Sequence, residues 1–186
     1  MRLVAGRFKG RVLAAPEGMT TRPTADRVRE SLFNILAHGE PALRGARVAD
    51  IFAGSGALGL EALSRGAAYV TFFETAPGAQ AVIAANVKKL GCEAEATLLC
   101  HDATRPPKAA APCQFLLLDP PYKGGLAAPA LVALAAQGWI APDARIIVEV
   151  AAAEAFTSPL PDFAVTDERK YGAARLVFLT SASRGN

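Results

Sequence analysis

Short runs of consecutive apolar residues alternate with segments of helical periodicity along most of this chain. Such short apolar runs are typical of the buried strands of a parallel sheet, whereas apolar positions three and four residues apart indicate helices. The pattern predicts strands at residues 48–52, 69–73, 96–100, 115–118 and 145–150, and helices at 57–65, 77–90 and 126–138. Because strands and helices alternate, we expect an α/β fold with a doubly wound, mostly parallel sheet.

The two ends of the chain depart from this alternation. Residues 163–171 and 174–180 are apolar runs with no room for a helix between them, so they predict an antiparallel pair that brings the sheet to seven strands. At the other end, residues 2–15 predict a short hairpin, and helical spacing from Val28 to Leu36 predicts a helix after it. We expect a single domain that spans residues 1–186. It consists of a hairpin and helix extension, residues 1–45, and a Rossmann-like core, residues 46–182.

The distribution of charge adds a prediction about partners. The formal net charge is only +3, yet residues 1–47 contain nine Arg or Lys against four Asp or Glu, while the remainder contains eleven against thirteen. This basic excess predicts an electropositive arm for a polyanionic partner, although an ordinary solvated surface would have the same composition.

Membrane and metal functions are not favoured by the sequence. No stretch approaches the roughly 18 consecutive apolar residues of a membrane span, and no signal peptide is visible, so we expect a cytoplasmic protein without membrane contact. Cys92, Cys100 and Cys113 lack C-x-x-C spacing, and His38 and His101 lack ligand-spaced partners. We therefore expect neither disulfides nor a bound metal.

A glycine-rich turn follows the first strand predicted for the core. In Asp50-Ile-Phe-Ala-Gly-Ser-Gly-Ala-Leu-Gly-Leu-Glu61 the glycines allow the backbone to approach a nucleotide closely. The spacing also fits a dinucleotide site, but the Asp50 carboxylate would repel phosphates, whereas it suits a cationic sulfonium and an amino group. A nicotinamide enzyme would also need a second domain for its substrate.

Two further acids follow the next strands along the chain. Glu74 ends the second core strand and could accept hydrogen bonds from ribose hydroxyls, while Asp102 follows the third and could meet the adenine edge. Either acid alone could equally be an exposed turn residue. Together with the glycine turn they predict a site for S-adenosylmethionine (SAM). The residues expected to contact this cofactor are Asp50, Phe52, Ala53, Gly54, Ser55, Gly56, Glu74, Asp102 and Ala103.

The segment Asp119-Pro120-Pro121-Tyr122 follows the apolar run 115–118 directly. The prolines fix the backbone and remove its donors, which leaves two acceptors, the Asp119 carboxylate and the Pro120 carbonyl. Two acceptors suit the two hydrogens of an exocyclic base amine, and Tyr122 could stack on the base. We therefore predict these four residues as the catalytic loop of an amino methyltransferase, against the simpler interpretation of a proline-rich turn.

The glycine turn and the Asp-Pro-Pro-Tyr loop resemble the first and fourth motifs of class I methyltransferases. The resemblance is closer to the RsmD family of 16S rRNA (guanine-N2)-methyltransferases. It rests on Arg22-Pro-Thr-Ala-Asp-Arg-Val-Arg-Glu-Ser-Leu-Phe-Asn-Ile-Leu36, on Ala5-Gly-Arg-Phe-Lys-Gly-Arg11 and on Glu168-Arg-Lys-Tyr-Gly172. Thr75-Ala76 departs from the family, which more often has a charged or polar pair there.

This resemblance implies SAM-dependent methylation of the N2 amine of one guanine in 16S rRNA, within the small ribosomal subunit. We expect a monomer whose basic residues contact RNA phosphates, some of them facing outward from the first helix. These residues are Arg7, Lys9, Arg11, Arg22, Arg27 and Arg29. Two alternatives stay open, namely an adenine-N6 methyltransferase acting on DNA or RNA, and an RNA-binding protein that has lost catalysis.

Overall fold

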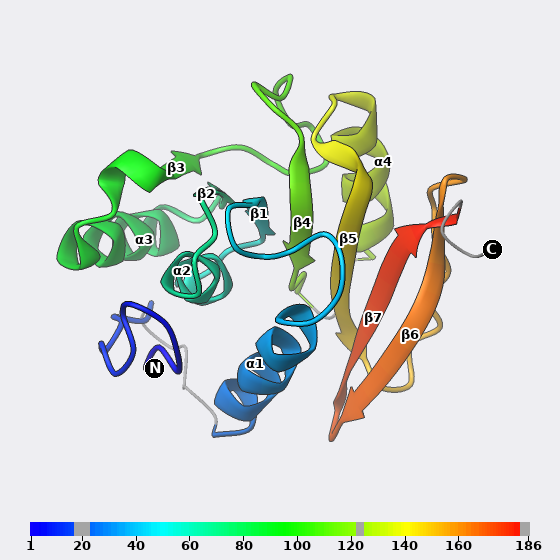
Figure 1. Cartoon of the computed structure of the whole chain (residues 1–186). Coiled ribbons are helices and arrows are strands. Elements are labelled where there is room, and N and C mark those ends of the chain that lie inside the picture. Colours follow the sequence, from blue (N-terminus) through cyan, green and yellow to red (C-terminus); the bar gives the residue numbers. More distant parts are fainter. Residues whose placement is uncertain (17–22, 122–124, 183–186) are drawn as a thin grey trace.

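The computed structural model describes residues 1–16, 23–121 and 125–182. These residues form one seven-stranded sheet with the order β3-β2-β1-β4-β5-β7-β6 (Figure 1). The strands are β1 (Arg47–Ile51), β2 (Tyr69–Phe73), β3 (Ala96–Leu99), β4 (Cys113–Leu118), β5 (Ile140–Ala151), β6 (Phe163–Tyr171) and β7 (Ala174–Ser181). Strands β1 to β5 pair in parallel, whereas β7 runs antiparallel to both of its neighbours. The predicted α/β fold with an antiparallel C-terminal strand is confirmed.

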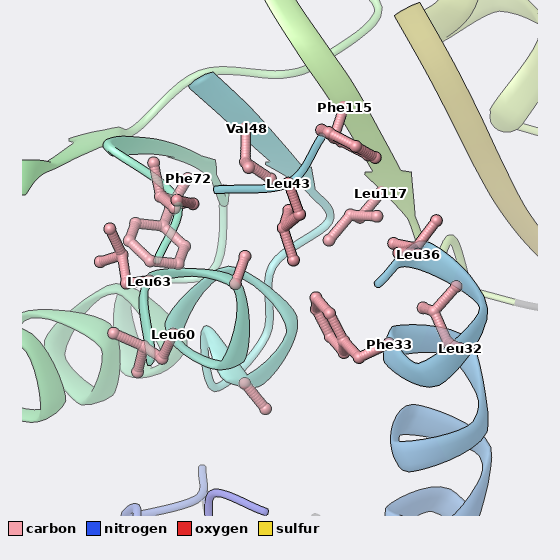
Figure 2. Close-up of a cluster of buried hydrophobic side chains, with 14 of the residues drawn as sticks. Leu32, Phe33, Leu36, Leu43, Val48, Leu60, Leu63, Phe72, Phe115 and Leu117 are labelled. Atoms are coloured by element: carbon pink, nitrogen blue, oxygen red, sulfur yellow. The ribbon is translucent and has the colours of Figure 1, made fainter. Parts of the chain in front are cut away.

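Helices cover both faces of the sheet. They are α1 (Pro23–Leu36), α2 (Ala57–Ser64), α3 (Pro77–Leu90), the short 3₁₀ helix η1 (Glu93–Glu95) and α4 (Ala127–Ala136). Helices α1, α2 and α3 pack on one face and α4 on the other, so alternate strand residues are buried in two separate apolar clusters. Figure 2 shows part of the first cluster, where Phe33 of α1 faces Leu117 of β4 beside α2.

The apolar runs predict the elements well because consecutive buried residues in a strand require cover on both faces. Two features were not predicted from them. Strand β5 begins at Ile140 instead of 145, with an irregularity in its pairing between Cys113 and Phe115. The turn of 3₁₀ helix before β3 was also not expected. None of the helices in the described part of the chain is long and apolar enough to cross a membrane.

The predicted hairpin is present at the start of the chain, where Arg2 and Val12 form an antiparallel bridge. It packs on α2 and α3 through buried polar side chains. Glu61 accepts hydrogen bonds from the amides of Val4 and Ala5, at 2.8 and 3.1 Å, and its side chain is fully buried. The hairpin is therefore fixed to the core instead of extending from it as an arm.

Candidate functional site

The carboxyl ends of the central parallel strands meet at one edge of the sheet. Ile51 pairs with Phe73 on one side and with Leu118 on the other, and Leu118 pairs with Val148. The next residue of each strand therefore lies in the same row. This row contains Phe52, Glu74, Asp119 and Glu149. Open parallel sheets bind ligands at this edge, next to the point where the strand order reverses between β1 and β4.

The glycine turn between β1 and α2 is tightly wound. Phe52 and Gly54 have positive φ angles of 62° and 55°, and Gly56 precedes α2 with φ 76°. A Cβ atom on Gly56 would lie 3.2 Å from Phe72 and 3.3 Å from Ile83, which is tight packing, and the positive φ is the main reason for glycine there. The turn brings the start of α2 to the strand edge, where backbone N–H groups can face a ligand.

Asp50 lies beneath this turn and is almost fully buried, with 1% of its surface exposed. The Gly59 amide donates a hydrogen bond to Asp50 Oδ2 over 2.8 Å, so the carboxyl links β1 to the first turns of α2. Burial raises the pKa of Asp50 well above its usual value, the Gly59 hydrogen bond opposes this, and Asp119 and Glu74 add to it. A cationic ligand above the turn would be favoured by this group of acids.

Glu74 is already engaged with the backbone. The amides of Gly54, Thr75 and Ala76 each donate to its carboxylate over 2.8 Å. A carboxylate has about four acceptor positions, so about one remains for a ligand, and the predicted hydrogen bonds from ribose hydroxyls stay a prediction. Glu74 thus also holds the glycine turn against the start of α3.

Asp102, on the loop after β3, likewise binds the neighbouring backbone and also lines a cavity. Its Oδ1 accepts hydrogen bonds from the amide and the hydroxyl of Thr104, both at 2.8 Å, and these bonds lower the pKa of Asp102. The side chain stays ionised at neutral pH and lines a cavity together with Glu74. The neighbouring Ala103 is buried and lines the same cavity.

Two cavities adjoin along this edge, each of a size typical for small ligands. The first has a volume of about 460 Å³ and the second about 490 Å³. They share Phe52, Gly54 and Asp119 as lining residues. The second cavity contains Glu74 and Asp102, and the first extends toward α1 and β5. Asp119 therefore lies where a ligand in one cavity would meet a ligand in the other.

Asp119 opens the loop after β4, and its amide donates to the Ile51 carbonyl over 3.3 Å. The residue is open to the cavities, but desolvation by the surrounding protein, followed by repulsion from Glu149, raises the pKa of its carboxyl to about 7. Pro120 is buried and Pro121 exposed, and both line the second cavity. Tyr122 lies outside the described residues, so its predicted stacking role stays a prediction.

Comparison with known proteins places the chain among methyltransferases. Residues 1–180 match the family model described as "Conserved hypothetical protein 95". The ribosomal RNA small subunit methyltransferase D of Escherichia coli strain K12 is 38% identical over 149 residues, which are 80% of this chain and 74% of that protein. The chain belongs to this methyltransferase family.

Other relatives agree with this membership. The protein of the same name in Haemophilus influenzae is 37% identical over 153 residues, covering 80% of this chain and 78% of that protein. The solved structure of the Escherichia coli protein YhhF has a TM-score of 0.84 and 33% identity, and the match covers 97% of each chain. The resemblance drawn from the motifs is confirmed, and the fold is that of a class I methyltransferase.

One of the basic residues predicted to face outward toward RNA is buried instead. Arg29 does not face outward from α1, because only 4% of its surface is exposed. It donates to the Arg2 carbonyl over 2.7 Å and lies 4.0 Å from Glu61. The physical reason is helical spacing, since Arg29 precedes Phe33 by one turn and shares its buried face. Its guanidinium helps to fix the hairpin and lines the first cavity.

The RNA contacts expected of the other basic residues stay predictions, and these residues differ in their surroundings. Arg7 is exposed but forms an ion pair with Glu95, and Arg11 donates to the Lys89 carbonyl over 3.2 Å. Lys9 and Arg27 are exposed. Arg22 lies outside the described residues.

Three residues that line the first cavity were missed by sequence reasoning. Met1 reaches the cavity from the hairpin, Tyr171 from the end of β6, and Glu149 from β5. Tyr171 was noted only as part of a family motif, and its hydroxyl lies 2.5 Å from Ser31 Oγ of α1. A signal for Glu149 exists in the sequence, because it is an acid directly after a buried strand run, as Asp119 is.

Proposed function

We propose that this methyltransferase transfers a methyl group from SAM to the exocyclic N2 amine of a guanine in small-subunit ribosomal RNA. The position of Asp119 carries the proposal. Its carboxyl lies at the junction of two cavities, so an amine bound in one would face a methyl donor bound in the other. The names of the relatives support small-subunit rRNA as the substrate class.

The residues around the second cavity fit the chemistry of SAM. Its adenosine part needs acceptors for hydroxyl and amine hydrogens, which Glu74 and Asp102 offer. Its cationic part suits the buried acid Asp50, which lines the adjoining first cavity. The glycine turn leaves room for close approach of the ligand to the backbone. When bound, SAM supplies a methyl group that its sulfonium makes electrophilic.

The Asp119 loop would act on the amine. A base amine is a weak nucleophile because its nitrogen lone pair is delocalised into the ring. The Asp119 carboxylate and the Pro120 carbonyl would accept its two hydrogens and orient the lone pair toward the methyl group. As the nitrogen gains a fourth bond, one N–H proton is released, and a carboxyl with a pKa of about 7 is suited to receive it.

Methyl incorporation into purified small ribosomal subunits from cells lacking the protein tests the proposal. Mass spectrometry of the RNA should find one N2-methylguanine that is absent without the enzyme. Asp119→Ala should abolish turnover and leave SAM affinity, measured by calorimetry, within a few-fold of wild type. Asp162→Ala changes the same residue type at an exposed position outside both cavities and should keep full activity.

Methylation of adenine, or of DNA alone, would contradict the proposal and favour the adenine-N6 alternative. Full turnover by Asp119→Ala would contradict the role of the loop even if guanine were the product. SAM binding without transfer to any nucleic acid would favour the non-catalytic alternative. Membership of a family named for methyltransferases argues against that outcome.

A further inference from the structure

A second carboxylate lies beside Asp119 in the cavity that would receive the base. Leu118 and Val148 are the last pair of the parallel ladder between β4 and β5, and Asp119 and Glu149 are the residues that directly follow them. Residues in register on parallel strands point to the same face, and their strands lie about 4.8 Å apart. The two acids therefore lie side by side at the strand edge.

Both acids line the first cavity, whose other walls are mainly apolar apart from Asp50, Arg29 and Ser55. Leu117, Ile147 and Leu176 form its floor from three adjacent strands, and Tyr171 lines it from the end of β6. A few polar groups in an otherwise apolar cavity are the arrangement that fixes the orientation of a flat ligand. Here the polar groups on the sheet side are carboxylates, which accept hydrogen bonds when ionised.

The two purines differ in what adjoins their exocyclic amine. In guanine the N2 amine is next to the ring N1–H, so amine and ring together present adjacent donors. In adenine the N6 amine is next to the N1 lone pair, which is an acceptor. An acceptor placed beside the amine-binding group would pair with guanine and oppose the lone pair of adenine.

We infer that Glu149 is a specificity residue that accepts the guanine N1–H while Asp119 and Pro120 hold the N2 amine. This inference rests on the proposed function, because it assigns the base edge read within the same site. Glu149 would also distinguish guanine N2 from adenine N6, which the Asp-Pro-Pro-Tyr loop alone does not do.

The electrostatics of the pair agree with this arrangement. Glu149 raises the pKa of Asp119, which means that the two neighbouring carboxylates repel each other. Donors from N1 and N2 of one guanine would face the pair and reduce that repulsion. Adenine offers donors from its amine only, so the charge on Glu149 would face its N1 lone pair.

A guanine analogue tests whether Glu149 recognises the N1–H group or supports activity in some other way. 2-Aminopurine keeps the 2-amino group that receives the methyl but has a lone pair at N1 and no O6. Small-subunit rRNA would be assembled with guanine or 2-aminopurine at the nucleotide identified by mass spectrometry. The measured quantity is the ratio of kcat/KM on the two substrates, which does not depend on the fraction of active enzyme.

Wild-type enzyme should prefer guanine by roughly 10- to 100-fold, the size of one well-placed base contact. Glu149→Gln should lower that ratio at least several-fold, because the amide of glutamine can donate to the N1 of 2-aminopurine. Glu149→Asp keeps an acceptor and should keep most of the preference at a reduced rate. Glu154→Gln, the same change at an exposed position outside the cavity, should leave the ratio unchanged.

An unchanged ratio in Glu149→Gln, with guanine still methylated at N2, would overturn the role of Glu149 and leave the proposed function intact. Failure of the wild-type enzyme to methylate guanine N2 at all would instead overturn the proposed function. The two failures are therefore distinguishable in one set of assays.

Discussion

The buried carboxylate of Glu61 gives the sharpest prediction about stability. This side chain has none of its surface exposed, and it joins the N-terminal hairpin to α2. The amides of Val4 and Ala5 donate to it, Arg65 Nε donates over 2.8 Å, and Arg29 Nε lies 4.0 Å away. Glu61→Gln keeps the size of the side chain but replaces one acceptor oxygen by a donor group and removes the charge.

The expected loss follows from these contacts. A hydrogen bond to a charged group contributes about 1.5 to 3 kcal/mol, and removal of one partner of a buried ion pair costs about 3 to 5 kcal/mol. Glutamine keeps one acceptor, so we expect Glu61→Gln to lower the free energy of unfolding by about 2 to 4 kcal/mol. For a chain of this length, that corresponds to a fall in Tm of roughly 4 to 16 °C.

A second glutamate provides the matched control. Glu95 also binds the hairpin, through Arg7, but the side chains of this ion pair are 35% and 45% exposed. Exposed ion pairs contribute little, so Glu95→Gln should cost less than about 1 kcal/mol. Urea unfolding at neutral pH measures both variants, and hydrogen exchange of the Val4 and Ala5 amides locates the change. Equal losses in the two variants, or unchanged exchange at Val4 and Ala5, would refute the reasoning.

Three further predictions concern the catalytic edge and its packing. Because desolvation by the surrounding protein and then Glu149 raise the pKa of Asp119 to about 7, and only the carboxylate accepts the amine hydrogens, kcat/KM should rise with pH to a plateau above about 7; a flat profile between pH 5 and 8 would contradict this. An acid whose folded pKa is raised loses stability as pH rises from its unfolded value to its folded value. Asp119→Asn should therefore melt at a higher temperature than wild type at pH 8, with the difference shrinking toward pH 4; a constant difference would argue against the shift. Gly59→Ala would place a Cβ 2.6 Å from Val70 Cγ1 and should cost about 1 to 3 kcal/mol in thermal unfolding, whereas Gly78→Ala, with open space around it, should not destabilise; equal melting of the two variants would be inconsistent with the packing.

The elements and their order could be predicted from the sequence because their signals are local. An apolar run such as 115–118 must be buried on both faces wherever it is placed, so it indicates a central parallel strand. The Asp119 loop and the glycine turn are equally local, since proline and glycine restrict or free the backbone at their own positions. The family resemblance also depended on contiguous motifs.

The neighbours of each side chain depended on the tertiary structure. Arg29 looked like one more basic residue of an exposed helix, but the docking of the hairpin and α2 buries it beside Glu61. The basic excess near the start of the chain gave no sign that Arg7 and Arg11 bind back to the core. Composition records how many charges a segment carries and does not record their partners.

The sequence by itself determined that this chain has a parallel sheet with a nucleotide-type turn and an amine-directed loop at one edge. Only the tertiary structure decided that Glu149 lies next to Asp119, that both share a cavity, and that a second cavity adjoins it. The physical reason is strand register, which is set by pairing between residues about 30 positions apart and by the burial of both sheet faces. Sequence patterns show that a strand exists, and the register of the folded sheet decides which residues of neighbouring strands are adjacent.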